Sequence, residues 1–110
     1  MLSKINRLTK ELDIKNVFSN KKSLFGNSII VNFIQTNNTE PRFAFVVSSK
    51  TFKKAVDRNY YKRILRSIVR ECLPNISKNF DFVIVIKNKI KDYKFEEVKE
   101  ECLNLFKKIK

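Results

Sequence analysis

The sequence predicts an α+β fold, in which helices pack on a mixed sheet of about four strands. Between residues 56 and 73, apolar side chains recur every three to four positions, a spacing that only a helix gathers onto one side. Residues 42–48 alternate apolar side chains as a strand does, and residues 80–86 form a near-continuous apolar run, which is typical of a strand buried on both faces. Helical and strand patterns in one short chain therefore indicate helices layered on a sheet.

The first helix is expected to begin after Thr9, which can cap it, and to end near Asn20. Ile14, Val17 and Phe18 recur at i, i+3 and i+4 and so lie on one face of this helix. That apolar face is expected to serve the core.

Three strands are expected next. A short one covers residues 23–25, and residues 29–34 are rich in β-branched and aromatic side chains. The clearest turn of the sequence, at residues 36–41, connects the latter to the strand at 42–48. We therefore expect the strands 29–34 and 42–48 to pair as an antiparallel hairpin.

The second half of the chain is expected to hold two helices and one strand. The helix at 56–73 ends before Pro74, the strand at 80–86 follows, and a last helix spans about 93–110. The last helix has its acidic residues toward its start and lysines at its end, as the helix dipole favours. The predicted order is α-β-β-β-α-β-α, with one layer of helices on the sheet, in a single domain over residues 1–110.

Charge is the anomaly of the composition. The chain of 110 residues carries 24 Lys and Arg against 11 Asp and Glu, a net charge of +13 that repels itself unless a polyanion neutralises it. The absence of His excludes every mechanism that needs an imidazole. Cys72 and Cys102 are too few for a disulfide framework or a four-ligand zinc site, so we interpret them as reduced thiols of a cytoplasmic protein.

A membrane partner is not expected. The start of the sequence has no apolar stretch of the length that a signal peptide needs, and no apolar run approaches the roughly 20 residues that span a bilayer. Nucleic acid is therefore the expected polyanion.

The excess charge is concentrated between residues 50 and 70, where eight basic residues and one acid give +7. Several of them recur at i, i+4 on the predicted helix, where like charges repel by a few tenths of a kcal/mol per pair. The planar forks of the arginines suit phosphate oxygens. We predict that RNA is bound by Lys50, Lys53, Lys54, Arg58, Asn59, Lys62, Arg63, Arg66 and Arg70.

The stretch 49–66 resembles the signature of the bacterial ribonuclease P protein subunit. That signature is a Lys-rich loop followed by Ala-Val-x-Arg-Asn-Arg-x-x-Lys-Arg-x-x-Arg, and the order of elements over nearly the whole chain also resembles this family. The third residue of the signature, usually Arg, is Tyr60 here, and Ser49-Lys50 stands where a lysine pair is usual. The matching positions are Ala55, Val56, Arg58, Asn59, Lys62, Arg63 and Arg66.

The resemblance implies the protein subunit of an endoribonuclease that removes the 5′ leader of precursor tRNA. It implies two partners, the ribonuclease P RNA and the single-stranded leader, and no obligate protein partner. Catalysis and Mg²⁺ would belong to the RNA, so no catalytic or metal-ligating residue is expected in this chain. The family's aromatic on the central strand falls on either Asn32 or Phe33. The leader-binding cleft is expected to be lined by Ile14, Phe18, Phe33, Asn59 and Arg63.

Other classes of protein stay open at this point. A non-enzymatic RNA-binding protein, such as a ribosomal component, would use the same basic helix for rRNA. A DNA-binding module is less favoured, because the sequence contains no helix-turn-helix pair and no zinc ligand set. For Phe18, simple core packing is the alternative to a role in stacking.

Overall fold

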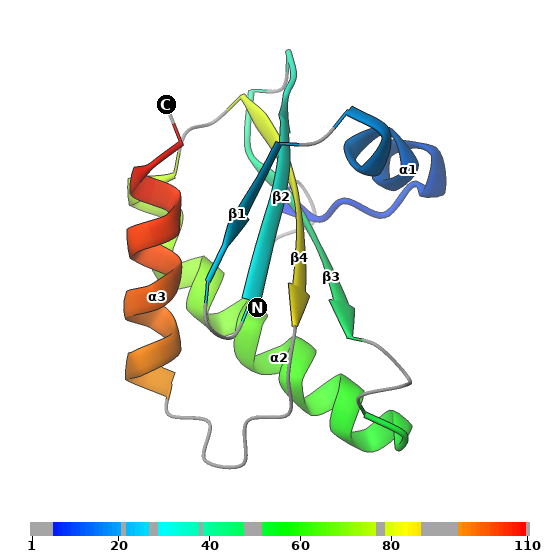
Figure 1. Cartoon of the computed structure of the whole chain (residues 1–110), viewed down its shortest axis with the longest axis vertical. Helices are drawn as coiled ribbons and strands as arrows, with labels where there is room; N and C mark the ends of the chain where they lie inside the picture. Colours follow the sequence, from blue (N-terminus) through cyan, green and yellow to red (C-terminus); the bar gives the residue numbers. More distant parts are fainter. Residues whose placement is uncertain are drawn as a thin grey trace.

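The computed structural model describes residues 6–20, 22–26, 29–37, 39–47, 52–76, 79–86 and 95–109. The predicted order α-β-β-β-α-β-α is confirmed, with one short 3-10 helix added after the second α-helix (Figure 1). The elements are α1 (Glu11–Asn20), β1 (Lys22–Phe25), β2 (Ile29–Gln35), β3 (Arg42–Val47), α2 (Ala55–Cys72), η2 (Leu73–Asn75), β4 (Phe80–Ile86) and α3 (Phe95–Lys107).

Helix α1 begins at Glu11, one residue later than expected for a helix capped by Thr9. The amide of Ile14 donates a 3.1 Å hydrogen bond to the carbonyl of Lys10, so Lys10 rather than Thr9 occupies the N-cap position.

The end of α2 agrees with the prediction. Helix α2 ends at Cys72, and Pro74 lies in the 3-10 helix η2 that follows. The proline terminates the helix as predicted because it cannot continue the α-helical hydrogen bonds.

The four strands form one mixed sheet in the order β1-β2-β4-β3. β4 pairs antiparallel with β2 and parallel with β3, so the predicted hairpin between β2 and β3 is wrong. The physical reason is that β4 is apolar on both sides and is buried along almost its whole length, which favours the centre of the sheet. The parallel pair of β3 and β4 needs a crossover connection, and α2 supplies it.

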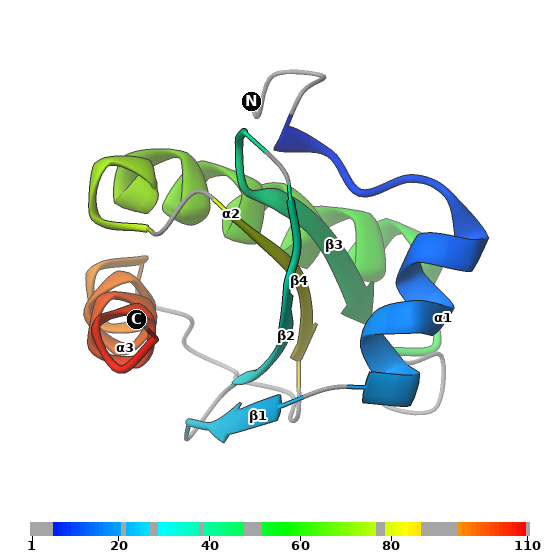
Figure 2. The ribbon, with the colours of Figure 1, turned by 90° about the horizontal axis from the view of Figure 1, so that it is seen from above.

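Helices cover both faces of this sheet, so the predicted single helical layer is also wrong. α2 and α3 lie on one face and α1 lies on the other (Figure 2). Alternate residues of β4 explain the arrangement, because Phe82 and Ile84 pack with α2 and α3 whereas Val83 packs with Val17 of α1. A strand that is apolar on both faces needs cover on both.

The larger core lies between the sheet and the pair α2 and α3. The rings of Phe43 and Phe82 stack at 4.9 Å, and Phe106 of α3 meets Phe82 edge-on at 5.4 Å. Cys72 and Cys102 are free, buried thiols of this core, and burial raises the pKa of each above its ordinary value. Both thiols therefore stay protonated and serve as small apolar side chains.

A partly buried ion-pair network, in which only Asp81 is buried, ties α1 to the other face of the sheet. Arg42 and Asp81 are register partners in β3 and β4, and the guanidinium donates to both carboxylate oxygens at 2.8 and 2.7 Å. The same guanidinium donates to Asp13 of α1 at 3.5 Å. The pKa of Arg42 is raised chiefly by its hydrogen bonds to Asp81, so the guanidinium stays charged and keeps both donors of this bidentate contact.

This pair makes a testable contribution to stability. Arg42→Ala leaves the carboxylate of Asp81, which is 3% exposed, without the guanidinium, and we expect the free energy of unfolding in urea to fall by about 2–3 kcal/mol. The matched control is Lys15→Ala, because the Lys15–Glu11 pair is largely exposed; its effect should stay below about 0.5 kcal/mol. Equal stability of the Arg42 variant and the wild-type protein would contradict this account.

Candidate RNA-binding site

Helix α2 separates apolar from basic residues around its circumference. Its buried side carries Leu65, Ile68, Val69 and Cys72 and packs on the sheet and α3. The remaining circumference is free to carry charge, which confirms the amphipathic helix that the sequence predicts. The cations of α2 nevertheless do not form one row.

The twist of the helix divides the predicted row into three directions. Each i+4 step advances by about 40°, so the three steps from Arg58 to Arg70 turn by about 120° around the axis. Arg58 folds back beneath the first turn, Lys62 and Arg66 face the edge of the sheet, and Arg70 is exposed on the outer side. Lys62, Arg66 and Arg70 thus remain within about 80° of arc, while Arg58, at the start of the predicted row, is turned to the loop.

Arg58 holds the loop that leads into α2. Its Nη1 donates to the main-chain carbonyls of Phe52 at 2.8 Å and Lys53 at 3.1 Å. A helical side chain covers the turn that precedes its own Cα, which is why a residue in the first turn reaches back to this loop. Phe52 is itself buried against the core, so the guanidinium fixes a packed segment.

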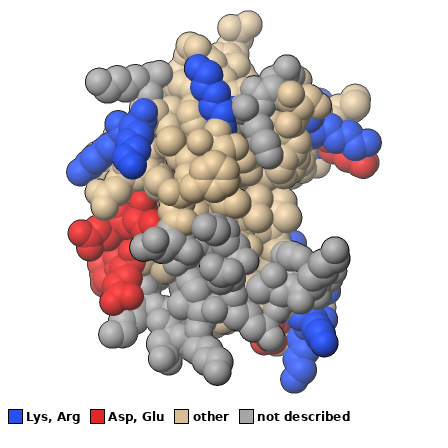
Figure 3. Space-filling model, viewed as in Figure 1, with Lys and Arg blue, Asp and Glu red and all other residues tan. Residues whose placement is uncertain are grey.

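The other predicted cations are exposed. Lys53 and Lys54 precede the helix, and Asn59, Arg63 and Arg70 lie on its solvent side. Lys50 lies outside the described residues. Figure 3 shows a patch of acidic side chains on the side of the molecule where α3 lies, and the first turn of α3 carries the exposed Glu96 and Glu97.

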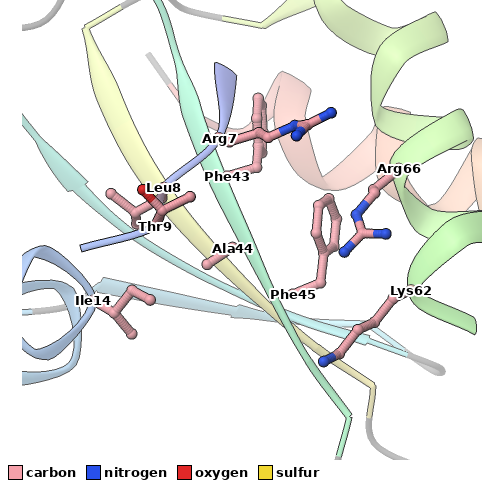
Figure 4. Close-up of a pocket in the computed structure, with 9 residues that line it drawn as sticks. All are labelled: Arg7, Leu8, Thr9, Ile14, Phe43, Ala44, Phe45, Lys62 and Arg66. Atoms are coloured by element: carbon pink, nitrogen blue, oxygen red, sulfur yellow. The ribbon is translucent and has the colours of Figure 1, made fainter. Parts of the chain in front are cut away.

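A pocket of about 400 Å³ opens where β3 forms the edge of the sheet. Residues from the N-terminal segment, α1 and β3 meet there with two basic residues of α2, and Figure 4 shows Lys62 and Arg66 extending from α2 toward β3. The residues that line it are Arg7, Leu8, Thr9, Ile14, Phe43, Ala44, Phe45, Lys62 and Arg66.

The N-terminal segment builds one wall by extending the sheet. Arg7 forms a parallel bridge with Phe43, the amide of Leu8 donates to the carbonyl of Phe43 at 2.8 Å, and Asn6 Nδ2 donates to the carbonyl of Pro41 at 2.9 Å. The chain then leaves toward α1. Main-chain groups alternate in direction along a strand, so the N–H and C=O of Phe45, like those of Phe43, point away from β4 into the pocket region.

The pocket combines positive charge with flat apolar surface. Arg7, Lys62 and Arg66 are its charged residues, and its described lining contains no acid. The half-buried ring of Phe45 contributes to its apolar part, whereas Phe43 lines the pocket with its ring buried in the core against Phe82. Cations beside aromatic surfaces are the combination that holds phosphates and bases of a single strand.

The predicted cleft agrees with this pocket only at Ile14. Asn59 and Arg63 are exposed on α2 and do not line the pocket, whereas their neighbours Lys62 and Arg66 do. Adjacent helical residues differ in direction by about 100°, so a register match along the sequence did not determine which of them faces β3. Phe18 of α1 is 40% exposed and is not among the lining residues.

The two alternatives on the central strand are both excluded from the pocket. Phe33 lies on the face covered by α2 and α3, where its ring is 5.9 Å from that of Phe80, so it does not line this pocket. Asn32 points to the other face but is buried, accepting from Ser23 Oγ at 2.7 Å and donating to the carbonyl of Val83 at 3.3 Å. Its amide links three strands of the sheet.

Sequence reasoning missed six lining residues, namely Arg7, Leu8, Thr9, Phe43, Ala44 and Phe45. They were missed because the expected β2–β3 hairpin places β3 beside β2 and does not predict that the N-terminal segment pairs with β3. The available signal was Arg7-Leu8, a basic residue next to an apolar one in an otherwise unassigned lead-in.

Within the described ranges, no cluster of three or more His, Cys, Asp or Glu side chains could hold a metal ion. None of the helices described is long and apolar enough to cross a membrane. The chemistry that these residues offer is the binding of phosphates and of flat apolar groups.

The fold and the pocket define a class of protein: a strongly basic α+β nucleic-acid-binding protein. Residues 2–110 match the family model described as Ribonuclease P, and the chain belongs to the ribonuclease P protein family. This family supplies the protein component of an endoribonuclease that processes tRNA, and membership implies a partnership with the ribonuclease P RNA.

Individual relatives agree. The ribonuclease P protein component of Onion yellows phytoplasma is 39% identical over 93 residues, which are 84% of this chain and 65% of that relative. That of Phytoplasma australiense is 39% identical over 103 residues, covering 93% of this chain and 89% of the relative. The solved structure of the RNase P protein from Thermotoga maritima matches with a TM-score of 0.86 at 33% identity, covering 94% of this chain and 97% of that one.

The contacts of Arg58 predict that it stabilises the fold. Arg58→Ala should lower the free energy of unfolding by about 1–2 kcal/mol, because two charge-assisted hydrogen bonds to the loop are lost. Arg70→Ala is the control, since Arg70 is exposed near the other end of the same helix; its effect should stay below about 0.5 kcal/mol. Urea denaturation measures both, and equal effects would show that Arg58 has no special structural role.

Proposed function

We propose that this protein binds the ribonuclease P RNA and the single-stranded 5′ leader of precursor tRNA, and that it thereby assists the endonucleolytic cut that gives the mature 5′ end. The observation that carries the proposal is the pocket at the β3 edge, where Arg7, Lys62 and Arg66 line the same cavity as the half-buried ring of Phe45. A role of this kind places the protein in the cytoplasm.

The leader is assigned to the pocket because of its mixed chemistry. A single strand presents a charged backbone and unstacked bases, and it needs cations and flat apolar surface within reach of each other. The outward N–H and C=O of Phe45 add one donor and one acceptor that can meet the edge of a base. Phe18, exposed on α1, is proposed to extend the apolar track beyond the pocket.

The RNA subunit is assigned to the exposed cations. Lys53 and Lys54 before α2 and Arg63 and Arg70 on its outer side are spread along the helix, which suits the phosphates of a large folded RNA. The two groups of cations adjoin each other around α2, with Arg66 and Arg70 about 40° apart, so one helix can contact both RNAs at neighbouring positions. Lys50 and Asn59 belong to the proposed RNA-binding set by their sequence alone.

The protein is proposed to supply fixed positive charge and no chemistry. Mg²⁺ is assigned to the RNA subunit, and the cations of this chain would replace part of the Mg²⁺ that the RNA otherwise needs to bring a precursor to its cleavage site. Contacts with the leader would then make the affinity for precursor tRNA higher than that for mature tRNA, because only the precursor carries a leader.

Salt dependence tests the pocket. If Arg7, Lys62 and Arg66 each contact a leader phosphate, the logarithm of the affinity for a single-stranded leader RNA should fall with log[salt] at a slope of about −2, at roughly 0.7 per contact. Lys62→Ala and Arg66→Ala should each make the slope shallower by about 0.7, whereas Arg70→Ala should leave it unchanged. An affinity indifferent to salt, or an equal effect of all three changes, would refute the assignment.

Cleavage assays test the division of labour. The protein freed of RNA should cut nothing, and with ribonuclease P RNA it should lower the Mg²⁺ concentration at half-maximal cleavage of precursor tRNA. The double variant Lys62→Ala/Arg66→Ala should lose most of this benefit on a precursor with a long leader and little of it on one with a single-nucleotide leader. Specific 5′ cleavage by the nuclease-treated protein alone, or no shift in the Mg²⁺ requirement, would overturn the proposed function.

A further inference from the structure

An apolar pair stands on the most exposed line of the basic helix. Val56 is 77% exposed and Tyr60 is 54% exposed, and they are neighbours at i and i+4 on α2. Arg63 and Arg70 lie on the same line, within about 80° of arc, because positions 56, 60, 63 and 70 differ by nearly whole turns. An aromatic ring and two arginines therefore share one outward strip of the helix.

The ring of Tyr60 is positioned by aromatic contacts that connect it to the core. It meets Tyr61 edge-to-face, with centroids 5.4 Å apart at 73°, and Tyr61 packs against the buried ring of Phe52 at 4.6 Å. An edge-to-face contact occupies at most one face of a ring, so Tyr61 leaves at least one face of Tyr60 uncovered. The exposed aromatic is a positioned surface that needs little further ordering when a ligand binds.

The surroundings fit an unpaired base of an RNA. Arg63 follows within one turn, and the exposed Lys53 and Lys54 precede the helix, so phosphates on either side of a base stacked on Tyr60 would meet cations. Core packing does not account for the ring, because the apolar side of α2 lies on the opposite side of the helix. The nearest acid of the helix is the exposed Asp57.

We infer that Tyr60 is a stacking platform for an unpaired base of the ribonuclease P RNA, with Val56 widening the apolar surface and Arg63 and Arg70 contacting adjacent phosphates. This inference rests on the proposed function and adds a residue to it. The leader is not the occupant, because Lys62, which faces the leader pocket, points about 160° away from Tyr60 around the helix.

A single tryptophan can report the stacking directly, since the chain contains none. Tyr60→Trp should bind the ribonuclease P RNA within about two-fold of wild type, because indole stacks at least as well as phenol. Its emission should be quenched in the complex, and its accessibility to acrylamide should fall several-fold. The matched control is Phe25→Trp, which replaces a 70%-exposed aromatic on β1 at the opposite edge of the sheet and should show neither change.

Affinity variants separate stacking from charge. Tyr60→Leu keeps an apolar side chain without a ring face, and its affinity for the RNA subunit should be lower by about 5- to 150-fold, with the salt slope unchanged. Tyr60→Phe should bind as the wild-type protein does. Tyr60→Arg should make the slope steeper by about one phosphate contact. Because the side chain is exposed, thermal unfolding of all three variants should match that of the wild-type protein within a few degrees.

Three results would overturn the inference: wild-type affinity in Tyr60→Leu, unchanged emission of Tyr60→Trp in the saturated complex, or an emission change that appears only when precursor tRNA is added. Failure of the wild-type protein to bind the ribonuclease P RNA would refute the proposed function instead, so the two failures are distinguishable.

Discussion

The burial of β4 on both faces is the constraint from which the rest of the architecture follows. An apolar strand of this kind is stable only in the middle of a sheet with helices on each side. Its central position separates β2 from β3, makes β3 an edge strand, and requires α2 to cross over between two parallel neighbours. The open edge of β3, the N-terminal segment beside it and the basic side of α2 then meet, and the pocket lies where they do.

Helical geometry gives the cations of α2 different surroundings. Residues four positions apart differ in direction by about 40°, so successive cations of one row meet different parts of the fold. The helical twist directs Arg58 to loop carbonyls, Lys62 and Arg66 to the pocket, and Arg70 to the outer side. Arg58 thus serves the fold itself, while Lys62, Arg66 and Arg70 are left to the proposed RNA contacts.

The elements were predictable because their signals are local. The spacing of apolar residues located α2, β4 and α3, and Pro74 marked the end of α2. The partners of the strands were not predictable in this way, because pairing depends on burial of the whole chain. The short turn between β2 and β3 favoured a hairpin, but the hairpin would have left the doubly apolar β4 at an edge.

The same distinction applies to the site. The motif residues located the basic helix but not the direction of each side chain, since a change of one position rotates it by about 100°. Phe33 illustrates the point for a strand: a shift of one residue exchanges the two faces, and the ring that was expected in the cleft packs with Phe80 in the core.

The acidic residues of the described chain do not line the pocket, although α2 itself carries the exposed Asp57. Asp13 and Asp81 form ion pairs with Arg42 on the face of the sheet that α1 covers. The exposed Glu96 and Glu97 lie at the start of α3, on the side where Figure 3 shows an acidic patch. The described lining of the pocket therefore contains positive charge alone, although the chain holds 11 acids. A polyanion attracts a basic helix and repels an acidic surface before contact, so this distribution of charge favours the proposed approach of RNA to α2 rather than to the start of α3. The arrangement of the charges, as much as their total, thus supports the assignment of α2 to the proposed RNA contact.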